Sequence, residues 1–328
     1  MYKGLVSEIP VFDVRSPSEF ERGHLPGAIS FPLFDDAERA IVGTLYKQQG
    51  KELAVLEGLR IVGPKLAGFV EQAIALAPGR ELAMYCWRGG MRSGSMAWLL
   101  RSAGFTVRLL QGGYKAYRQT VQHHFTNAFP FIVLSGPTGS GKTEILAELR
   151  ALGEQVIDLE DLAKHRGSAF GALGMDKQPS IEQFENNLYH QIELLDLSKR
   201  IWIEDESRNI GKVALHEGLW QNLDNAPLVL LESSMEDRVL RLVKEYGKFD
   251  PELLRASLNK IAKRLGGLTF QEGIEALETG DLAKVAEITL RYYDKSYHFS
   301  REKRGRVVQE TVNAIGLMPN EIAQLLLK

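Results

Sequence analysis

The 328-residue sequence predicts an α/β protein with two domains, each built around a mainly parallel sheet, and with a helical extension on the second. Three observations lead to this fold class. The chain is longer than a typical single domain, short apolar strands alternate with helical stretches in both halves, and a glycine-rich phosphate-binding motif follows one of those strands. The composition, 44% hydrophobic and 25% charged residues, is that of an ordinary folded globular chain.

The first domain is expected to span residues 1–125. Its predicted strands lie at 11–14, 82–85 and 107–110. An amphipathic helix over 96–103 is predicted between the last two, and this alternation favours a mainly parallel sheet. The polar, histidine-rich segment QTVQHHFTNAFP, which ends at Pro130, indicates a connector to the second domain.

The second domain is expected to span residues 126–328. It begins with the strand, loop and helix of FIVLSGPTGSGKTEILAELR and continues with QVIDLE, a helix over 182–197, and the strands IWIEDE and APLVLLE. This is the rhythm of a P-loop α/β domain. Beyond Met235 the sequence becomes helical and charged, with a helix that starts at the cap Asp250 and has Pro251 at its first position. We therefore expect the C-terminal third to be a helical extension.

The totals exclude several classes of protein. No apolar run is long enough to span a membrane and no secretory signal is recognisable, so we expect a cytoplasmic protein without membrane contact. Cys86 is the only cysteine, which excludes an intramolecular disulfide and a cysteine-based metal cluster. The net charge of −2 divides into +4 for residues 1–125 (15 basic, 11 acidic) and −6 for the rest (25 basic, 31 acidic). A nucleic-acid partner would therefore have to bind local basic patches.

The segment MYCWRGGMRSGS places Cys86 between a predicted strand and a predicted helix. Backbone amides of such a loop and the helix N-terminus stabilise an anion, lower the thiol pKa and favour a nucleophilic thiolate. The alternative is a buried cysteine that only packs, which the arginines and glycines of the same turn make the weaker interpretation. The predicted anion loop consists of Cys86, Trp87, Arg88, Gly89, Gly90, Met91 and Arg92.

GPTGSGKT fits the Walker A pattern and stands between an apolar strand and a helix. In this motif the glycines let backbone amides surround phosphates, the lysine reaches the terminal charges, and the threonine can bind Mg²⁺. A glycine-rich turn without a ligand is the weaker alternative. The motif predicts a polyphosphate without specifying which one, and the predicted phosphate-binding residues, at which the family resemblance given below implies a diphosphate, are Gly136, Thr138, Gly139, Ser140, Gly141, Lys142 and Thr143.

Two further polar clusters follow strands of the second domain, where the active site of such a sheet is expected. One is a candidate Mg²⁺ site or second motif, with solvated acids and a polar turn as the alternative, and consists of Glu204, Asp205, Glu206, Ser207 and Arg208. The other is a candidate substrate site, with the charged face of a helix as the alternative, and consists of Asp158, Glu160, His165 and Arg166. The sequence leaves the identity of a bound metal open.

Two stretches near the C-terminus are basic and partly aromatic. Residues 238–264 contain eight Lys or Arg against three acids, and residues 291–306 contain six against two, interleaved with tyrosines. Cations bind phosphates and aromatic rings stack on unpaired bases, whereas the alternative is a solvated helix with tyrosines in the core. The candidate RNA-binding residues are Arg255, Lys263, Arg264, Tyr292, Tyr293, Lys295, Tyr297 and Arg301.

DVRSPSEFERGHLPGAISFP, CWRGGMRS and LLQGGYKAY together resemble the three signatures of a rhodanese domain. In that family the cysteine carries a sulfane sulfur as a persulfide, so the resemblance implies Cys86 as the carrier. The residues that match the family's first, structural motif are Asp13, Arg15, Glu19, His24 and Gly27. For His24 we expect a structural role.

The loop from Cys86 to Arg92 spans seven residues, as in the rhodanese-like cell-cycle phosphatases, whereas the usual rhodanese loop spans six. The longer loop predicts a wider anion site. We interpret it as able to hold a phosphorylated chalcogen donor such as selenophosphate.

CWRGGMRS, GPTGSGKT, DLEDLAKHRGSAFG, ESRNIG and YYDKSY, in this order, resemble the tRNA 2-selenouridine synthase family along nearly the whole chain. The resemblance implies a transferase that takes selenophosphate and geranyl diphosphate as co-substrates and holds no tightly bound cofactor. It implies as partners the tRNAs for Lys, Glu and Gln with wobble 2-thiouridine, and allows contact with a selenophosphate-producing enzyme. The implied reaction converts 2-thiouridine to its S-geranyl derivative and then to 2-selenouridine, with Lys142 and Thr143 at the diphosphate.

Three other functions share some of these motifs. A sulfurtransferase fused to an ATP-dependent kinase for a small molecule would use both loops. A phosphatase would use the seven-residue loop through Cys86, but it leaves the P-loop domain unexplained. A non-catalytic, nucleotide-dependent RNA-binding module predicts full activity in cells after Cys86→Ser.

Overall fold

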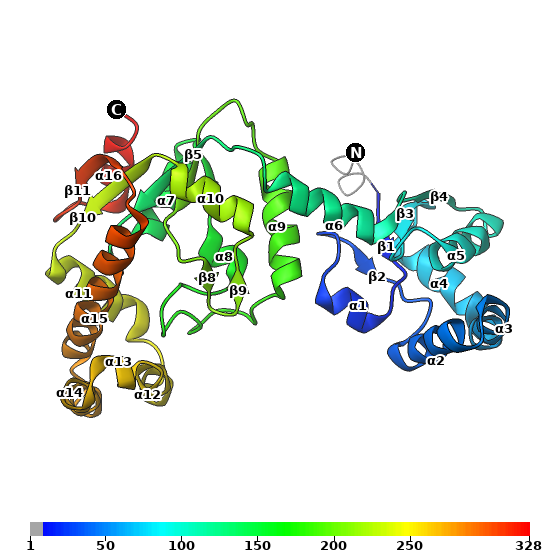
Figure 1. Cartoon of the computed structure of the whole chain (residues 1–328), viewed down its shortest axis with the longest axis horizontal. Helices are drawn as coiled ribbons and strands as arrows, with labels where there is room; N and C mark the ends of the chain where they lie inside the picture. The colour runs from blue at the N-terminus through cyan, green and yellow to red at the C-terminus, as the bar shows by residue number, and fades with distance from the viewer. Residues whose placement is uncertain (1–8) are drawn as a thin grey trace. The chain divides into compact units, whose positions relative to one another are not determined.

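The computed structural model describes residues 9–328, and the chain forms two compact units (Figure 1). The first unit extends to His124 and also takes in Glu185–Leu194. The second unit consists of Phe125–Phe184 and Leu195–Lys328. Each unit has its own all-parallel main sheet with helices packed on it, which confirms the predicted α/β fold class.

The sheet of the first unit has the strand order β2-β1-β3-β4. Its strands are β1 (Val11–Asp13), β2 (Ile29–Ser30), β3 (Glu81–Tyr85) and β4 (Thr106–Leu109). All three strands predicted for this domain are confirmed. Asp13 and Tyr85 are register partners at the carboxyl ends of β1 and β3, so the residues that follow these strands meet at one edge of the sheet.

The helices of the first unit are α1 (Pro17–Arg22), α2 (Asp36–Gln48), α3 (Lys51–Val62), α4 (Leu66–Leu76), α5 (Met91–Ser102) and α6 (Gly113–His124), with a 3-10 turn at Gly63–Lys65. The helix predicted over 96–103 starts earlier, at Met91, because Gly90 caps it directly after the cysteine loop. The first part of the predicted connector, up to His124, is wrong, because these residues continue helix α6. Tyr114, Tyr117 and Val121 lie on one buried side of α6, and the polar residues that suggested a connector form its exposed side.

The main sheet of the second unit has the order β11-β10-β5-β7-β6. Its strands are β5 (Phe131–Ser135), β6 (Gln155–Ile157), β7 (Ile201–Glu204), β10 (Leu228–Glu232) and β11 (Val308–Asn313), and a separate hairpin is formed by β8 (Asn209–Ile210) and β9 (Val213–Ala214). The central strand β5 leads into the glycine-rich loop. That loop therefore emerges between the ends of β7 and β10.

The helices of the second unit are α7 (Lys142–Ala151), α8 (Leu159–Ala163), α10 (Glu217–Asn225), α11 (Met235–Tyr246), α12 (Pro251–Asn259), α13 (Ala262–Leu265), α14 (Gly267–Glu278), α15 (Leu282–Arg304) and α16 (Pro319–Leu325). Helix α9 (Ile181–Glu193) contributes to both units. Asp250 caps α12 by accepting from Glu252 N at 2.8 Å, as predicted.

The predicted helical extension is confirmed as α11 to α16, but the sequence did not reveal β11, which returns to the main sheet beside β10. Most β11 residues are exposed because the strand lies at the edge of the sheet. Its sequence is therefore mostly polar and lacks the apolar run by which a buried strand is predicted. Two apolar cores among the described residues of the second unit bear on the site. One packs around β5, β7, β10 and α7, and the other lies among helices α12, α14 and α15. No helix within 9–328 is long and apolar enough to cross a membrane.

Candidate active sites

The cysteine loop joins the end of β3 to the start of α5, and Cys86 is its first residue. Cys86 is only 3% exposed and lies at the edge of the core of the first unit. Ser93 Oγ donates a hydrogen bond to Cys86 Sγ at 3.2 Å. Tyr114 N, at the start of α6, donates to the Cys86 carbonyl at 2.9 Å, and this contact fixes the loop from behind.

Several donors surround the Cys86 sulfur. Burial raises the pKa of the Cys86 thiol, but hydrogen bonds from the Ser93 hydroxyl and from the backbone N–H groups of Ser93, Arg88 and Gly90 outweigh burial, so the pKa lies below its ordinary value of 9.0. A cysteine that only packed in the core would lack these donors. The arrangement favours a thiolate and an anion next to it.

We expect Ser93→Ala to move the pH midpoint of Cys86 alkylation to higher pH. The variant removes the side-chain donor that stabilises the thiolate, so a higher pH is needed to form it. The measurement is the rate of iodoacetamide alkylation as a function of pH. Ser95→Ala is the control, since the Ser95 hydroxyl donates to the Met91 carbonyl on the exposed side of α5. An unchanged midpoint in Ser93→Ala would show that this donor does not tune the thiol.

Residues of the first rhodanese motif lie beside the anion loop, and Glu19 contacts it directly. Arg92, the last loop residue, forms a two-pronged ion pair with Glu19 of α1, at 2.5 and 3.2 Å. Asp13 and Arg15 form a fully buried ion pair at 2.6 Å. His24 stacks on the Phe20 ring, and its Nδ1 lies 2.9 Å from the Phe20 carbonyl oxygen. Burial lowers the pKa of His24, which fits a structural, neutral imidazole.

The P-loop of the second unit runs from the end of β5 into α7. Gly139 and Gly141 have φ values of 79° and 85°, which non-glycine residues rarely adopt. A Cβ at Gly141 would also lie 2.9 Å from Arg241 Cζ. Lys142 Nζ donates to the Gly136 carbonyl at 3.0 Å, across the mouth of the loop. The amides of the loop and the lysine ammonium thus form the cationic end of a site for an anion.

Two arginines of α11 hold the outer side of this loop. Arg238 Nε donates to the Thr138 carbonyl at 2.8 Å, and Arg241 Nη1 donates to the Gly139 carbonyl at 2.6 Å. Arg238 is itself paired with Asp294 of α15 at 2.5 Å. Because these carbonyls are engaged by cations, they do not repel an anion bound inside the loop.

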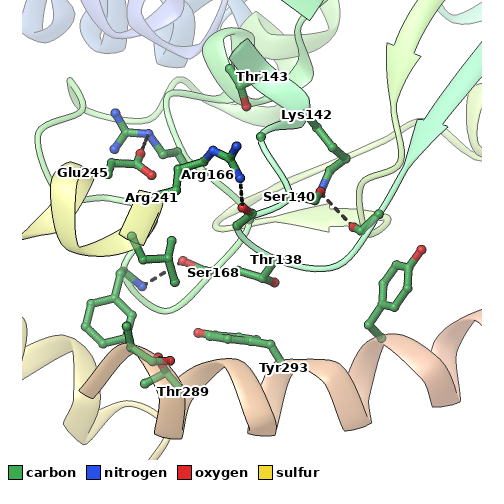
Figure 2. A pocket seen from close by; sticks show the side chains of 18 of the residues that line it. Thr138, Ser140, Lys142, Thr143, Arg166, Ser168, Arg241, Glu245, Thr289 and Tyr293 are labelled. Atoms are coloured by element: carbon green, nitrogen blue, oxygen red, sulfur yellow. Dashed lines mark hydrogen bonds and ion pairs between the residues drawn. The ribbon is translucent and has the colours of Figure 1, made fainter. Parts of the chain in front are cut away.

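The P-loop opens into a cavity of about 490 Å³ that has two chemically different ends. The polar end contains the P-loop with Lys142 and Thr143. Figure 2 shows Thr289 and Tyr293 across the cavity, on α15. The apolar end is lined by Phe170, Leu242, Val243, Tyr246, Leu254, Leu282, Val285 and Ala286. Several of these belong to the helical core, so the cavity extends from the phosphate loop into that core.

Acidic side chains gather beside Lys142 and Thr143. Thr143 Oγ1 donates to Glu160 Oε2 at 3.2 Å, and Glu160 N donates to Glu204 Oε1 at 2.7 Å. Burial and the neighbouring Glu206 raise the pKa of Glu160 to about 8. Burial also raises the pKa values of Glu204 and Glu206. A bound cation would relieve this repulsion, and a hydroxyl and two carboxylates are ligands that Mg²⁺ accepts.

Asp205 is engaged differently from these acids. Its carboxylate accepts from Ser135 Oγ at 2.5 Å, from Arg304 Nη1 at 3.1 Å and from Arg306 Nη1 at 2.7 Å. Arg304 also pairs with Asp224 at 2.6 Å. Asp205 therefore ties the end of α15 to β5 and β7, which leaves Glu160 and Glu206 as the carboxylates available beside Lys142.

Of the other predicted site residues, some line the cavity and others do not. Arg166 and Ser207 line the cavity. Asp158 caps α8 by accepting from Asp161 N at 2.7 Å, and the exposed Arg208 pairs with Glu217 at 2.7 Å. His165 and Glu204 are not among the cavity-lining residues, although Glu204 binds Glu160.

The candidate tRNA-binding residues fall into two groups. Tyr293, Tyr297 and Arg301 line the P-loop cavity. The others lie outside its lining: Arg255, which pairs with Glu278; Arg264, which donates to the Tyr292 hydroxyl; and the exposed Lys263 and Lys295.

Sequence reasoning missed four residues of these sites, namely Ser93, Arg241, Arg304 and Arg306. Arg304 and Arg306 lie in RYYDKSYHFSREKRGR, whose basic character suggested an RNA surface. The structure buries them against Asp205 at the cavity. A serine seven residues after Cys86, at the first turn of the following helix, is the one signal that could have identified Ser93.

Comparison with known proteins gives consistent matches in both units. Residues 2–120 match the rhodanese-like domain family, and residues 129–315 match the tRNA 2-selenouridine synthase AAA domain family. The tRNA 2-selenouridine synthases of Shewanella denitrificans and Verminephrobacter eiseniae are each 36% identical to the chain, over 91% and 92% of it and 90% and 92% of their own lengths. A shikimate kinase structure from Acinetobacter baumannii matches 63% of this chain and 94% of its own, at 15% identity and a TM-score of 0.30.

Proposed function

This chain belongs to the tRNA 2-selenouridine synthase family, and on that premise we propose that it replaces the sulfur of wobble 2-thiouridine in tRNA by selenium in two stages. In the first stage the sulfur takes a geranyl group from geranyl diphosphate. In the second, a selenium nucleophile derived from selenophosphate displaces the S-geranyl group. The proposed substrates are the tRNAs for Lys, Glu and Gln.

The observation that carries the first stage is the two-ended cavity of the second unit. Geranyl diphosphate has a highly negatively charged diphosphate head and a ten-carbon apolar chain. The P-loop with Lys142 suits the head, and the wall around Leu254 and Val285 suits the chain. Each buried methylene stabilises the complex by about 0.8 kcal/mol, so the apolar end provides substantial affinity beyond that of the head alone. The adenosine of ATP would place polar base and ribose atoms against the same wall.

The chemistry of the first stage needs a stabilised leaving group. The thiocarbonyl sulfur attacks the first carbon of the chain, the new S–C bond forms, the C–O bond to diphosphate breaks, and the N3 proton of the base is lost to solvent. Lys142 and the loop amides stabilise the negative charge that grows on the departing diphosphate. We propose that Thr143, Glu160 and Glu206 hold Mg²⁺, which would neutralise further charge on the diphosphate.

The second stage is assigned to the cysteine loop. Alkylation makes the sulfur a better leaving group, because a thiol departs from an activated carbon more easily than a thiocarbonyl sulfur is lost. The loop that lowers the pKa of Cys86 also suits the anions of selenium chemistry. We propose that Cys86 orients selenophosphate, whose selenium attacks the activated carbon as geranylthiolate leaves and whose Se–P bond is then hydrolysed to release phosphate.

The apolar wall is tested by Ala286→Leu. Ala286 is 7% exposed and lines the apolar end of the cavity, so three added carbons occupy space that the chain would use. We expect the KM for geranyl diphosphate to rise about tenfold or more, with binding of inorganic diphosphate unchanged. Leu240→Phe, on the exposed side of α11, is the control. An equal loss of affinity for geranyl diphosphate and for inorganic diphosphate would show that the geranyl group does not bind beside Ala286.

Calorimetric titration of the full-length protein tests the proposed ligand. We expect geranyl diphosphate to bind more tightly than inorganic diphosphate, with a negative heat-capacity change from the buried chain. ATP is expected to bind more weakly than geranyl diphosphate. Tighter binding of ATP, with turnover in the absence of RNA, would instead favour the sulfurtransferase and kinase alternative.

A further inference from the structure

Three large apolar side chains next to the cysteine loop face solvent. Trp87 is 38% exposed, Met91 is 51% exposed and Trp98 is 67% exposed. Met91 and Trp98 are seven residues apart on α5, so two helical turns bring them to the same side. The buried residues of α5 lie on the opposite side and include Met96 and Leu100. We name Trp87, Met91 and Trp98 the α5 face.

The α5 face is held in a fixed position. The centroid of the Trp87 ring lies 5.9 Å from that of the Tyr114 ring. The Arg15 guanidinium lies over the same Tyr114 ring, 3.8 Å from its centroid. Tyr114 and Arg15 are both buried, so Trp87 is supported from inside while part of its surface remains open. Single exposed apolar residues need no explanation, but two on one side of a helix, with an exposed tryptophan in the loop that leads into it, favour a binding surface.

The exposed charged residues that adjoin Trp87 are positive. Helix α5 contains Arg92 and Arg101 and no acidic residue. Arg88 follows Trp87 in the sequence, and Lys115 N donates to the Trp87 carbonyl at 2.8 Å. Both Arg88 and Lys115 are exposed. Glu19, which lies near the loop, is already paired with Arg92. Aromatic side chains flanked by cations complement unpaired bases joined by phosphates.

We propose that the α5 face is a stacking surface for unpaired nucleobases of the RNA substrate. The proposal rests on the proposed function, which makes an RNA loop the substrate. Met91 and Trp98 are about 10 Å apart along the helix axis, which matches about three stacked nucleotides. Because Trp87 directly follows Cys86, bases stacked on this face bring the neighbouring nucleotide to the cysteine loop.

The test is the affinity of the full-length protein for tRNA with a 2-thiouridine anticodon loop, measured by fluorescence anisotropy without geranyl diphosphate or selenophosphate. We expect Trp98→Ala to weaken binding about tenfold and Trp98→Phe to restore most of it, because a phenyl ring still stacks. Leu59→Ala, at an exposed position on α3, is the control and should leave the affinity unchanged. A fully paired RNA of equal length should not distinguish Trp98→Ala from the unmodified protein.

Three outcomes would overturn the proposal. One is an unchanged affinity of Trp98→Ala for the tRNA. Another is an equal loss of affinity for the paired RNA, which would mean that unpaired bases are not what the face binds. The third is a change of Trp98→Ala in sedimentation with normal RNA affinity, which would assign the face to a protein partner or a second copy.

The proposal and the proposed function can fail separately. If Trp98→Ala loses RNA affinity while the unmodified protein makes no 2-selenouridine, the RNA-binding role of the α5 face is supported and the proposed reaction is contradicted. If Trp98→Ala binds tRNA normally and selenation proceeds, only the surface falls.

Discussion

Lys142→Ala is expected to lower the rate of 2-thiouridine geranylation by at least about a hundredfold. In the structure Lys142 Nζ donates to the Gly136 carbonyl across the mouth of the P-loop, where the diphosphate would replace that carbonyl as its partner. Loss of one preorganised charged donor at a developing anion costs about 10²–10³ in rate. The measurement is single-turnover conversion, followed by mass spectrometry of nucleosides.

Lys164→Ala is the matched control for this variant. Lys164 belongs to the nearby α8 turn and pairs with Asp161 at 2.7 Å, so its loss removes a lysine of the same unit outside the P-loop. We expect normal geranylation in this control and similar unfolding temperatures for both variants. A Lys142→Ala protein that is folded and keeps more than about a tenth of the rate would show that the diphosphate does not use this lysine.

Cys86→Ser is expected to spare geranylation and to abolish selenation, so that S-geranyl-2-thiouridine accumulates. The serine preserves size and can accept the hydrogen bond from Ser93, but it does not ionise near neutral pH and therefore supplies no thiolate to orient the selenium donor. The measurement is the ratio of S-geranyl-2-thiouridine to 2-selenouridine when both co-substrates are present.

Loss of geranylation in Cys86→Ser would contradict this division of labour between the two units. The matched variant is Ser93→Ala, which keeps the thiol and removes one donor to it. We expect that variant to slow selenation near neutral pH and to approach the unmodified rate as the pH rises, because more of the thiol ionises. Equal selenation rates at all pH values would exclude the thiolate from the slow step.

The sequence predicts the buried strands well because each is a short apolar run covered on both sides. β3, β5 and β7 are examples, with nearly every residue buried. The same rule fails for β11, an edge strand whose exposed polar residues resemble a loop. It also fails for α6, where the buried apolar side chains of Tyr114, Tyr117 and Val121 form a narrow stripe among polar ones.

The two loops could be predicted because local sequence determines them. Gly139 and Gly141 supply left-handed backbone that the P-loop requires, and the cysteine loop is continuous in the chain. Contacts between distant segments could not be predicted in this way. Arg238 and Arg241 reach the P-loop from about a hundred residues away, and the apolar end of the cavity exists only because α11 and α15 pack together.

The most direct test of the two-stage account is mass spectrometry of nucleosides from 2-thiouridine-containing tRNA incubated with the purified protein. Geranyl diphosphate and selenophosphate are supplied first separately and then together. We predict S-geranyl-2-thiouridine with geranyl diphosphate alone, its decline as 2-selenouridine appears when selenophosphate is added, and no 2-selenouridine when geranyl diphosphate is withheld. Unchanged 2-thiouridine in every mixture, or 2-selenouridine formed without geranyl diphosphate, would contradict the account.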